Sequence, residues 1–367
     1  MDAGRFFGGT STVIIAEIGT SHGGELGHAR ELVDAAAEAG ADCVKTQIVY
    51  ADEIVHPLTG RVSLPGGEIP LYERFRELEV SPAFFAALAE HCGRRGVTFL
   101  ASVFGRRSLE VLGRLRGLGV DAVKIASPEL NHLPLLHAVA ETGLEIVLST
   151  GVATLSDIER AVDACGDACG MLHCVTAYPA PEEEYNLRVV PALRQIFGVG
   201  VGVSDHSTDP VLVPAAAVSL DADVIEKHLT LSREGNGLDD RVALEPAAFS
   251  DMVRAVRRAE RQGPEHTFGE LRERYGASRL EKVLGDGVKR LAPSEKANYG
   301  RSNRSILATA DIPEGEPIDI HNAAILRSEH NLTPGLSPSL WERIRGARAV
   351  RPIENGTGVR FDHLLTR

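Results

Sequence analysis

The stretch "VGVGVSDHSTDP" (199–210) begins as an apolar run and ends in a polar cluster that includes His206. A second stretch, "DVIEKHLT" (223–230), repeats the pattern and places His228 after another apolar run. Short runs rich in Val and Ile are typical of β-strands that are buried on both faces, as in a parallel sheet. The two histidines therefore stand at the ends of two buried strands, and the fold depends on how many such strands the chain contains.

Eight runs of this kind occur before residue 263, and stretches with the apolar spacing of helices separate them. The predicted strands lie at 12–19, 42–47, 97–102, 121–127, 145–150, 170–175, 199–205 and 223–229. Start and stop signals support this division, because Ser81-Pro82 suits a helix start, whereas Gly40 and Gly96 suit helix ends. The stretch "TLSDIERAV" likewise offers Thr, Ser and Asp at a helix start.

Eight βα units over residues 1–263 predict an α/β fold of the (β/α)8 type, a TIM barrel. An open, doubly wound sheet is the alternative arrangement. Such a sheet more often carries a glycine fingerprint after an early strand, and no GxGxxG motif follows any of the predicted strands. We therefore favour the barrel.

The composition of the 367-residue chain excludes several classes of protein. A formal net charge of −12 argues against a nucleic-acid binder and against a basic protein of membrane surfaces. No apolar run approaches the ~20 residues that span a bilayer, and the first residues lack the regions of a signal peptide. The five cysteines are odd in number and form no CxxC motif, so we expect reduced, buried thiols in a cytoplasmic protein.

In a barrel of parallel strands the chemistry lies at the C-terminal face, where the strands end. Polar residues stand at or just beyond the end of each predicted strand. They are Glu17, Lys45, Gln47, Ser102, Lys124, Ser127, Glu129, Ser149, Thr150, Tyr178, Ser204, Asp205, His206, Glu226, Lys227 and His228. Each residue alone has an ordinary structural interpretation, such as a solvated strand end. A set that converges from all eight strands indicates an active site.

The cations and hydroxyls of this set suit an anionic ligand. Lys45 and Lys124 would bind a compound that carries phosphate and carboxylate groups together, because fixed cations and neutral donors are what a small polyanion requires. The nearby hydroxyls are those of Ser102, Ser127, Ser149 and Ser204. A phosphate site alone is weakly specific, since many barrels bind phosphate.

The histidines suit a metal. The imidazoles of His206 and His228 favour Mn, Fe, Co or Zn over Mg, and two protein ligands leave positions for water and a substrate oxygen. Glu17 and Asp239 are carboxylates available for proton transfer or for binding sugar hydroxyls. A phosphate compound beside a metal-activated aldehyde suggests carbon–carbon bond formation.

Seven motifs follow one another along the barrel: "IIAEIGTSHGG", "AGADCVKTQ", "VKIASPELNHLPLL", "VLSTGVAT", "LHCVTAYPAP", "VGVSDHS" and "VIEKHLTL". Their order resembles that in the sialic acid synthases, a family that includes N-acetylneuraminate, legionaminic acid and pseudaminic acid synthases. The resemblance covers most of 12–263. It resumes in "NRSILATADIPEGEPI" and "GARAVRPIENGTGV", which are similar to the small antifreeze-like (SAF) domain of these synthases.

The resemblance implies that phosphoenolpyruvate condenses with an open-chain aldose, such as an N-acylated hexosamine, to give a nine-carbon 2-keto sugar acid and phosphate. The residues implied to hold phosphoenolpyruvate are Lys45, Ser102, Lys124, Ser127, Ser149 and Ser204. The pair His206 and His228 would bind a divalent metal, usually Mn²⁺, with Mg²⁺ and Co²⁺ as alternatives. The implied catalytic set is Glu17, His206, His228 and Asp239. The residues implied to face the sugar are Gln47, Glu129, Tyr178 and Arg304.

Several residues depart from the motifs of the family. "NHNG" appears as "SHGG", "KFQ" appears as "KTQ" with Thr46, and Thr176 replaces an asparagine thought to touch the substrates. "GPD" and "SLEP" appear as "GLD" and "ALEP", and "RPG" appears as "RSE" at 327–329. Pockets built on hydrogen bonds discriminate strongly, so lost amide side chains alter the choice of substrate. We therefore expect that the acceptor need not be N-acetylmannosamine.

The rest of the chain divides into two segments. Residues 264–300 mix charge, Gly and Pro without a sustained apolar period, which predicts a linker with one short helix; an excursion packed on the barrel is the alternative. Residues 301–367 place turn signals between short apolar runs and predict a small β-rich capping domain. The resemblance implies a homodimer in which this domain covers the partner's barrel and Arg304 reaches the sugar.

Two other functions stay open. A metal-dependent aldolase that uses pyruvate would neither consume phosphoenolpyruvate nor release phosphate. A catalytically silent, sugar-binding barrel would usually have lost its metal ligands or its phosphate-binding lysines. All four of these residues are present here: Lys45, Lys124, His206 and His228.

Overall fold

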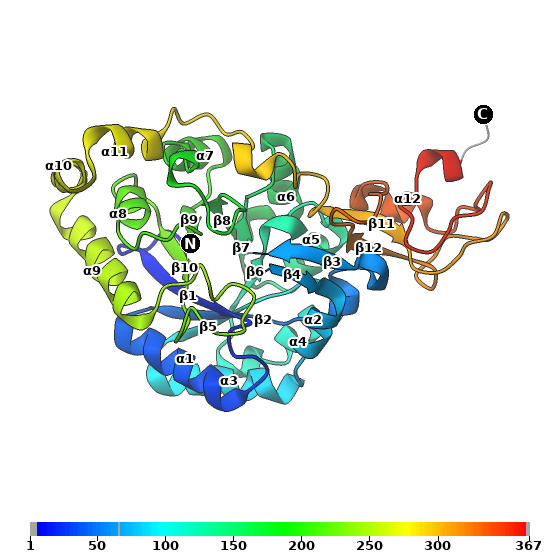
Figure 1. The fold of residues 1–367 in the computed structure, drawn as a ribbon, viewed down its shortest axis with the longest axis horizontal. Helices are drawn as coiled ribbons and strands as arrows, with labels where there is room; N and C mark the ends of the chain where they lie inside the picture. The colour runs from blue at the N-terminus through cyan, green and yellow to red at the C-terminus, as the bar shows by residue number, and fades with distance from the viewer. Residues whose placement is uncertain (1–5, 65–66, 365–367) are drawn as a thin grey trace.

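Residues 6–64 and 67–364 are described by a computed structural model, in which eight parallel strands close into a barrel. The order around the barrel is β1-β10-β9-β8-β7-β6-β5-β2 (Figure 1). The strands are β1 Val13–Gly19, β2 Cys43–Gln47, β5 Thr98–Ser102, β6 Ala122–Ile125, β7 Glu145–Ser149, β8 Cys169–Cys174, β9 Val201–Asp205 and β10 Val224–His228. The predicted (β/α)8 barrel is confirmed, and the strand ends lie close to those expected.

A helix follows each barrel strand and covers the outside of the sheet (Figure 1). These helices are α1 Leu26–Ala39, α3 Pro82–Arg95, α4 Arg106–Gly113, α5 Leu133–Ala140, α6 Leu155–Cys165, α7 Val189–Phe197, α8 Leu212–Val218 and α9 Pro246–Gln262. Gly40 and Gly96 end α1 and α3 with φ of 93° and 74°, the left-handed conformation that glycine adopts without strain. Thr154 caps α6 through a capping box with Asp157. In the described part of the chain, no helix is long and apolar enough to cross a membrane.

The bottom of the barrel is filled by side chains from the start of the chain. Phe6 and Phe7 pack with the inward-facing residues of the strands, among them Ile15 and Leu100. A Cβ atom on Gly170 would lie 2.4 Å from the Phe7 ring, so a larger residue there would displace the ring. The N-terminal end of the barrel is therefore packed, and the open end is the C-terminal one, where the predicted site residues stand.

The segment 264–300 is not the linker with one short helix that was predicted. It forms α10 (Pro264–Tyr275) and α11 (Ala277–Leu284), with Gly276 between them. The two helices contribute Leu271, Leu280, Val283 and Leu284 to the main hydrophobic core. The alternative of an excursion packed on the barrel is correct, and each helix is too short to show a sustained apolar period.

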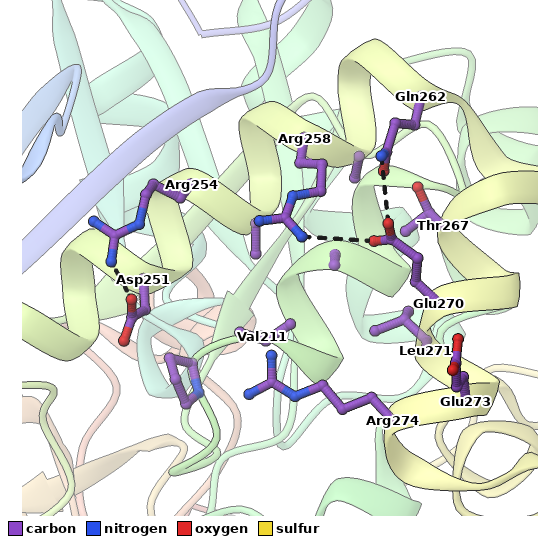
Figure 2. Close-up of a pocket in the computed structure, with 14 residues that line it drawn as sticks. Val211, Asp251, Arg254, Arg258, Gln262, Thr267, Glu270, Leu271, Glu273 and Arg274 are labelled. Carbon is purple, nitrogen blue, oxygen red and sulfur yellow. Dashed lines mark hydrogen bonds and ion pairs between the residues drawn. The ribbon is translucent and has the colours of Figure 1, made fainter.

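A groove of about 480 Å³ lies where α9 and α10 meet (Figure 2). One Nη atom of Arg258 lies 3.9 Å from the Glu270 carboxylate, to which Gln262 also donates a hydrogen bond of 3.3 Å. Arg254 pairs with Asp251 on the same helix. The contacts of Arg258 and Gln262 with Glu270 link α10 to α9, the last helix of the barrel. The groove contains none of the predicted site residues.

The C-terminal domain is small and β-rich, as predicted. Strands β11 (Arg304–Ala308) and β12 (Ala323–Arg327) pair antiparallel beside the short helix α12 (Trp341–Ile344). Figure 1 shows the domain, in orange to red, at one side of the barrel near a hairpin of β3 (Arg61–Leu64) and β4 (Gly67–Pro70), which precedes α2 (Leu71–Glu77).

The C-terminal domain docks on the barrel of its own chain. Arg327 forms a parallel bridge with Val55, and its backbone N–H donates to the carbonyl of Ile54 at 2.9 Å. Asn331 donates to the backbone oxygens of Thr59 and Arg61 at 2.6 and 2.7 Å. The domain is therefore held by backbone pairing to the loop that follows β2.

Candidate active site

A cavity of about 660 Å³ opens at the C-terminal end of the barrel. Its walls contain twelve of the residues to which the sequence assigned a role, drawn from all eight strands or the loops after them. They are Glu17, Lys45, Gln47, Ser102, Lys124, Ser127, Ser149, Tyr178, Ser204, His206, His228 and Asp239. The convergence expected from the sequence is thus present in the structure, whereas Glu129 and Arg304 lie elsewhere.

The floor of the cavity is a buried network of two lysines and two carboxylates. The ammonium of Lys45 lies 2.9 Å from the Glu17 carboxylate and 3.5 Å from Glu226. The ammonium of Lys124 lies 3.3 Å from the same oxygen of Glu226, and the hydroxyl of Ser204 donates to that oxygen at 3.0 Å. Buried charges of opposite sign at these distances stabilise one another.

The network gives the two lysines different proton affinities. Burial opposes charge on Glu226, but Lys124 and Lys45 outweigh it and lower the pKa of Glu226 to about 2. Burial also lowers the pKa of Lys124, and Glu226 offsets this only in part. At Lys45 the carboxylates of Glu17 and Glu226 outweigh burial and raise the pKa. Lys45 therefore holds its proton more strongly than Lys124 does.

Among the buried oxygens of the floor that have no hydrogen-bond partner within residues 6–64 and 67–364 are Oγ of Ser149 and Oε2 of Glu226. Buried polar atoms in folded proteins are nearly always satisfied by protein, water or ligand. Ser127, one strand away, is oriented by the N–H of Gly151, which donates to its Oγ at 3.0 Å. The hydroxyls of Ser127 and Ser149 suit the oxygens of a small polyanion placed above the lysines, whereas the ionised Glu226 can only accept a hydrogen bond.

A glycine makes room for the polar side chains on the β1 side of the cavity. Gly19 has φ of 48°, and a Cβ atom there would lie 3.4 Å from Oε1 of Glu17 and 3.5 Å from Nε2 of Gln47. These two side chains are joined by a hydrogen bond of 2.9 Å from Gln47 to Glu17. The carboxylate of Asp239 approaches the same point.

The two histidines stand together at the mouth of the barrel. The centroids of the His206 and His228 rings are 5.5 Å apart, and the Tyr178 ring stacks on His206 at 4.2 Å. Nδ1 of His206 lies 2.9 Å from the carbonyl oxygen of Val175, so this nitrogen carries a proton. Nε2, which lies 3.5 Å from Oγ of Ser204, is the nitrogen that would ligate a metal once deprotonated. The carboxylate of Asp239 lies 3.9 Å from Nδ1 of His228.

This pair fits a divalent cation. Burial, followed by the charges of His206 and Lys45, lowers the pKa of His228, and the neutral imidazole is the form that binds a metal. No group of three or more His, Cys, Asp or Glu side chains suited to a metal occurs among the described residues. The protein therefore offers two imidazole nitrogens and leaves the other positions of an ion to water and substrate.

The structure places Glu129 and Arg304 together, outside the lining of this cavity. Both side chains are fully buried beneath the C-terminal domain, and they pair with one another at 3.0 Å. Arg304 also donates to the backbone oxygens of Ile54 and Phe104 at 3.2 and 3.1 Å. A buried guanidinium needs such acceptors, so Arg304 is held by the fold and does not reach the sugar-binding side of the cavity.

Arg327 is the arginine of the C-terminal domain that lines the cavity. Its Nη2 and Nε lie 2.6 and 3.0 Å from the same oxygen of Glu129 that binds Arg304. The C-terminal domain of the described chain contributes to the lining of this cavity. The homodimer in which this domain covers the partner's barrel stays a prediction. The other residues that the C-terminal segment contributes are Asn298, Ser302, Glu329, His330 and Asn331.

Two important residues received no role from the sequence. Glu226 was among the predicted strand-end residues but was given no role. It stands two residues before His228, so the alternation of side chains along a strand places both on the same face of β10. Arg327 could not be found in this way, because its position depends on how β12 docks against residues 54–55. The hairpin residues Arg61 and Glu68, which line the rim, likewise carried no sequence signal.

The chain is thus a closed (β/α)8 barrel whose C-terminal mouth combines a lysine–carboxylate floor, a histidine pair and residues of a small β-rich domain. The chain belongs to the NeuB family, whose profile matches residues 32–266. The SAF domain profile matches residues 303–365.

Curated relatives and a solved structure extend over nearly the whole chain. The spore coat polysaccharide biosynthesis protein SpsE of Bacillus subtilis is 36% identical over 96% of this chain and 94% of its own length. Its crystal structure covers 97% of this chain and 96% of that one, with 35% identity and a TM-score of 0.81. The N,N'-diacetyllegionaminic acid synthase of Campylobacter jejuni is 31% identical over 93% of this chain and 96% of its length.

Proposed function

We propose that this protein condenses phosphoenolpyruvate with the open-chain aldehyde of an aldose to give a 2-keto sugar acid of the sialic acid type. The observation that carries the proposal is one cavity that combines the Lys45–Lys124 floor with the His206–His228 pair. Its relatives include N,N'-diacetyllegionaminic acid synthases, which supports the same reaction class.

Phosphoenolpyruvate would lie on the floor. Lys45 and Lys124 neutralise the phosphate and carboxylate groups, and the hydroxyls near them donate hydrogen bonds. Those hydroxyls belong to Ser102, Ser127, Ser149 and Ser204. The unpartnered Ser149 Oγ is a donor that this ligand would satisfy. Binding by fixed charges also orients C3 of phosphoenolpyruvate toward the mouth.

The reaction would proceed by attack of C3 of phosphoenolpyruvate on the aldehyde carbon, with a proton taken up by the aldehyde oxygen. Water adds at C2, and the bond between C2 and the phosphate oxygen then breaks. Phosphate leaves, and the oxygen from water becomes the keto group. Glu17 and Asp239, which face one another across Gly19, are the carboxylates placed to handle protons and sugar hydroxyls.

A divalent metal, proposed to be Mn²⁺ with Mg²⁺ or Co²⁺ as alternatives, would be held by His206 and His228. When bound, it supplies Lewis-acid polarisation of a carbonyl oxygen. Tyr178 keeps the His206 ring in place by stacking on it, and Val175 fixes its tautomer.

The acceptor is proposed to be an N-acylated hexosamine or a related aldose. Gln47, Tyr178 and Asp239 face the space above the floor, and Arg327 faces it from the C-terminal domain. Of the departures from the family motifs, Thr176 lines the cavity, whereas Thr46 is buried and donates to the carbonyl oxygen of Gly19 at 3.0 Å. The substitution at 176 therefore bears on substrate choice, and the one at 46 bears on packing.

The test is phosphate release from phosphoenolpyruvate with Mn²⁺ across a panel of aldoses that includes N-acylated hexosamines and their 6-phosphates. Release that depends on one acceptor and stops with EDTA is the expected result. Turnover of pyruvate without phosphate release would favour the aldolase. Failure to bind phosphoenolpyruvate, measured by calorimetry, would refute the proposal and leave a silent, sugar-binding barrel.

A homodimer and a cytoplasmic location are also proposed. The five cysteines are buried and form no disulfide among the described residues, which supports a reducing compartment. Light scattering on the purified protein would give the mass of the assembly, and a monomer would refute the dimer.

A further inference from the structure

Glu329, just after β12, has an unusual backbone conformation for its residue type. Its φ is 49°, in the left-handed region that glycine adopts readily and glutamate rarely adopts. The turn is fixed on both sides, because the N–H of Glu329 donates to the carbonyl of Arg301 at 3.1 Å and Leu332 donates to the carbonyl of Ser328 at 3.1 Å. A strained residue that the surroundings hold in place is a feature of functional sites.

The side chain of Glu329 faces the cavity above the barrel. Each of its polar neighbours from the same domain is already bonded. Arg327 binds Glu129, His330 lies 2.9 Å from the Asn298 side-chain oxygen, and Asn331 binds two carbonyls of the barrel loop. Within residues 6–64 and 67–364, no hydrogen bond or ion pair reaches the carboxylate of Glu329.

The two arginines near Glu329 are already committed to another carboxylate. Arg304 and Arg327 share the single carboxylate of Glu129, and Glu329 supplies the second negative charge, so the four side chains sum to zero. Burial raises the pKa of Glu329, since few donors solvate its carboxylate, although Arg327 and His330 oppose this effect. The cap end of the cavity therefore offers a hydrogen-bond acceptor with negative charge.

We propose that Glu329 selects the acceptor sugar: its carboxylate accepts hydrogen bonds from hydroxyl or amino groups at the end of the sugar remote from the aldehyde, and it repels a phosphate there. This inference rests on the proposed synthase function. It makes the acceptor an unphosphorylated aldose, because a like charge placed opposite an unpaired carboxylate acts against binding.

The test compares an N-acylated hexosamine that supports turnover with its 6-phosphate, using kcat/KM for phosphate release. We expect the wild type to prefer the unphosphorylated sugar by about tenfold or more. Glu329→Gln removes the charge and keeps the size, so the preference should fall about tenfold, through the KM of the acceptor and not that of phosphoenolpyruvate. Glu316→Gln, at an exposed glutamate of the same domain, should leave the preference unchanged.

Glu329→Gly gives an independent readout. Glycine relieves the left-handed backbone, so the midpoint of thermal unfolding should rise while the preference still falls. Equal use of both sugars by the wild type, or a preference that Glu329→Gln does not change, would overturn the inference and leave the synthase function standing. Absence of phosphate release with every acceptor would overturn the synthase function, and this inference with it.

Discussion

The guanidinium of Arg304 in the C-terminal domain lies 3.0 Å from the carboxylate of Glu129, which follows barrel strand β6. Both side chains are fully buried, so the contact joins the two domains of one chain inside a dry interface. The same oxygen of Glu129 binds Arg327. One carboxylate therefore fixes the cap and orients the arginine that faces the cavity.

Removing one partner of this pair should destabilise the protein strongly. Arg304→Ala leaves the charge of Glu129 with Arg327 alone and leaves backbone oxygens such as that of Phe104 without a donor. Breaking a buried pair in this way costs about 3–5 kcal/mol. The free energy of unfolding in urea checks this value. Arg345→Ala, in an exposed pair with Glu342, should change it by less than ~0.5 kcal/mol. Equal stability of Arg304→Ala and the wild type would contradict the structural role.

His206→Ala should abolish metal-dependent turnover and weaken Mn²⁺ binding. The variant removes one of two imidazoles at the mouth and the stacking partner of Tyr178. Binding of Mn²⁺, followed by electron paramagnetic resonance, gives a readout that does not depend on substrate. His321→Ala, at an exposed histidine of the C-terminal domain, is the control. Full activity of His206→Ala with bound Mn²⁺ would remove the ligand assignment.

The stability of the protein should fall in acid because of His173. Burial, with a contribution from Lys289, lowers the pKa of His173 to about 3, and its Nε2 donates to the carbonyl of Tyr185. Below the unfolded pKa of about 6.5, the His173 imidazole binds a proton in the unfolded chain but stays neutral in the folded chain. Stability is therefore full above pH 6.5 and declines toward the folded pKa, by about 2 kcal/mol between pH 6.5 and 5.

The variant His173→Gln keeps a side-chain donor and removes this titration. Its free energy of unfolding should depend less steeply on pH over the same window, by ~1 kcal/mol per pH unit. Parallel urea titrations of both proteins provide the measurement. Identical pH slopes would show that another group controls the acid sensitivity, with His22, whose pKa burial lowers to about 4, as the next to test.

Substitution of Gly151, after β7, should destabilise the protein because a larger side chain would clash with neighbouring hydroxyls. A Cβ atom at this position would lie 2.0 Å from Oγ1 of Thr176 and 3.0 Å from Oγ of Ser127. Gly151→Ala should destabilise the protein by about 1–3 kcal/mol, and adding Thr176→Ala should restore part of the loss. Gly93→Ala, in helix α3 with open space around it, should raise stability slightly. Additive losses in the double variant would rule out the proposed clash.

The barrel and most of its site could be predicted because they depend on local patterns. Apolar runs gave the strands, and the parallel arrangement brings their C-terminal ends to one mouth. His206 and His228 follow from this geometry alone. The helices α10 and α11 were missed, because each presents only two or three apolar residues to the barrel and Gly276 interrupts them.

The choice between Arg304 and Arg327 could not be made from the sequence. Both residues lie at the paired ends of β11 and β12, in direct register. Which arginine turns toward the cavity and which is buried depends on the docking of this sheet against Val55. The sequence contains no local pattern for such a contact, since its partners lie more than 200 residues away along the chain.

In the described structure the floor of the cavity and the cap residues that line it come from one chain, and this arrangement predicts a genetic outcome. A variant with a defective floor, such as Lys124→Ala, and a variant with a defective cap, such as Arg327→Ala, should not restore activity when they are produced together. In a swapped dimer, mixed pairs would rebuild an intact mouth. Two defective alleles of this protein should therefore fail to complement in the same cell.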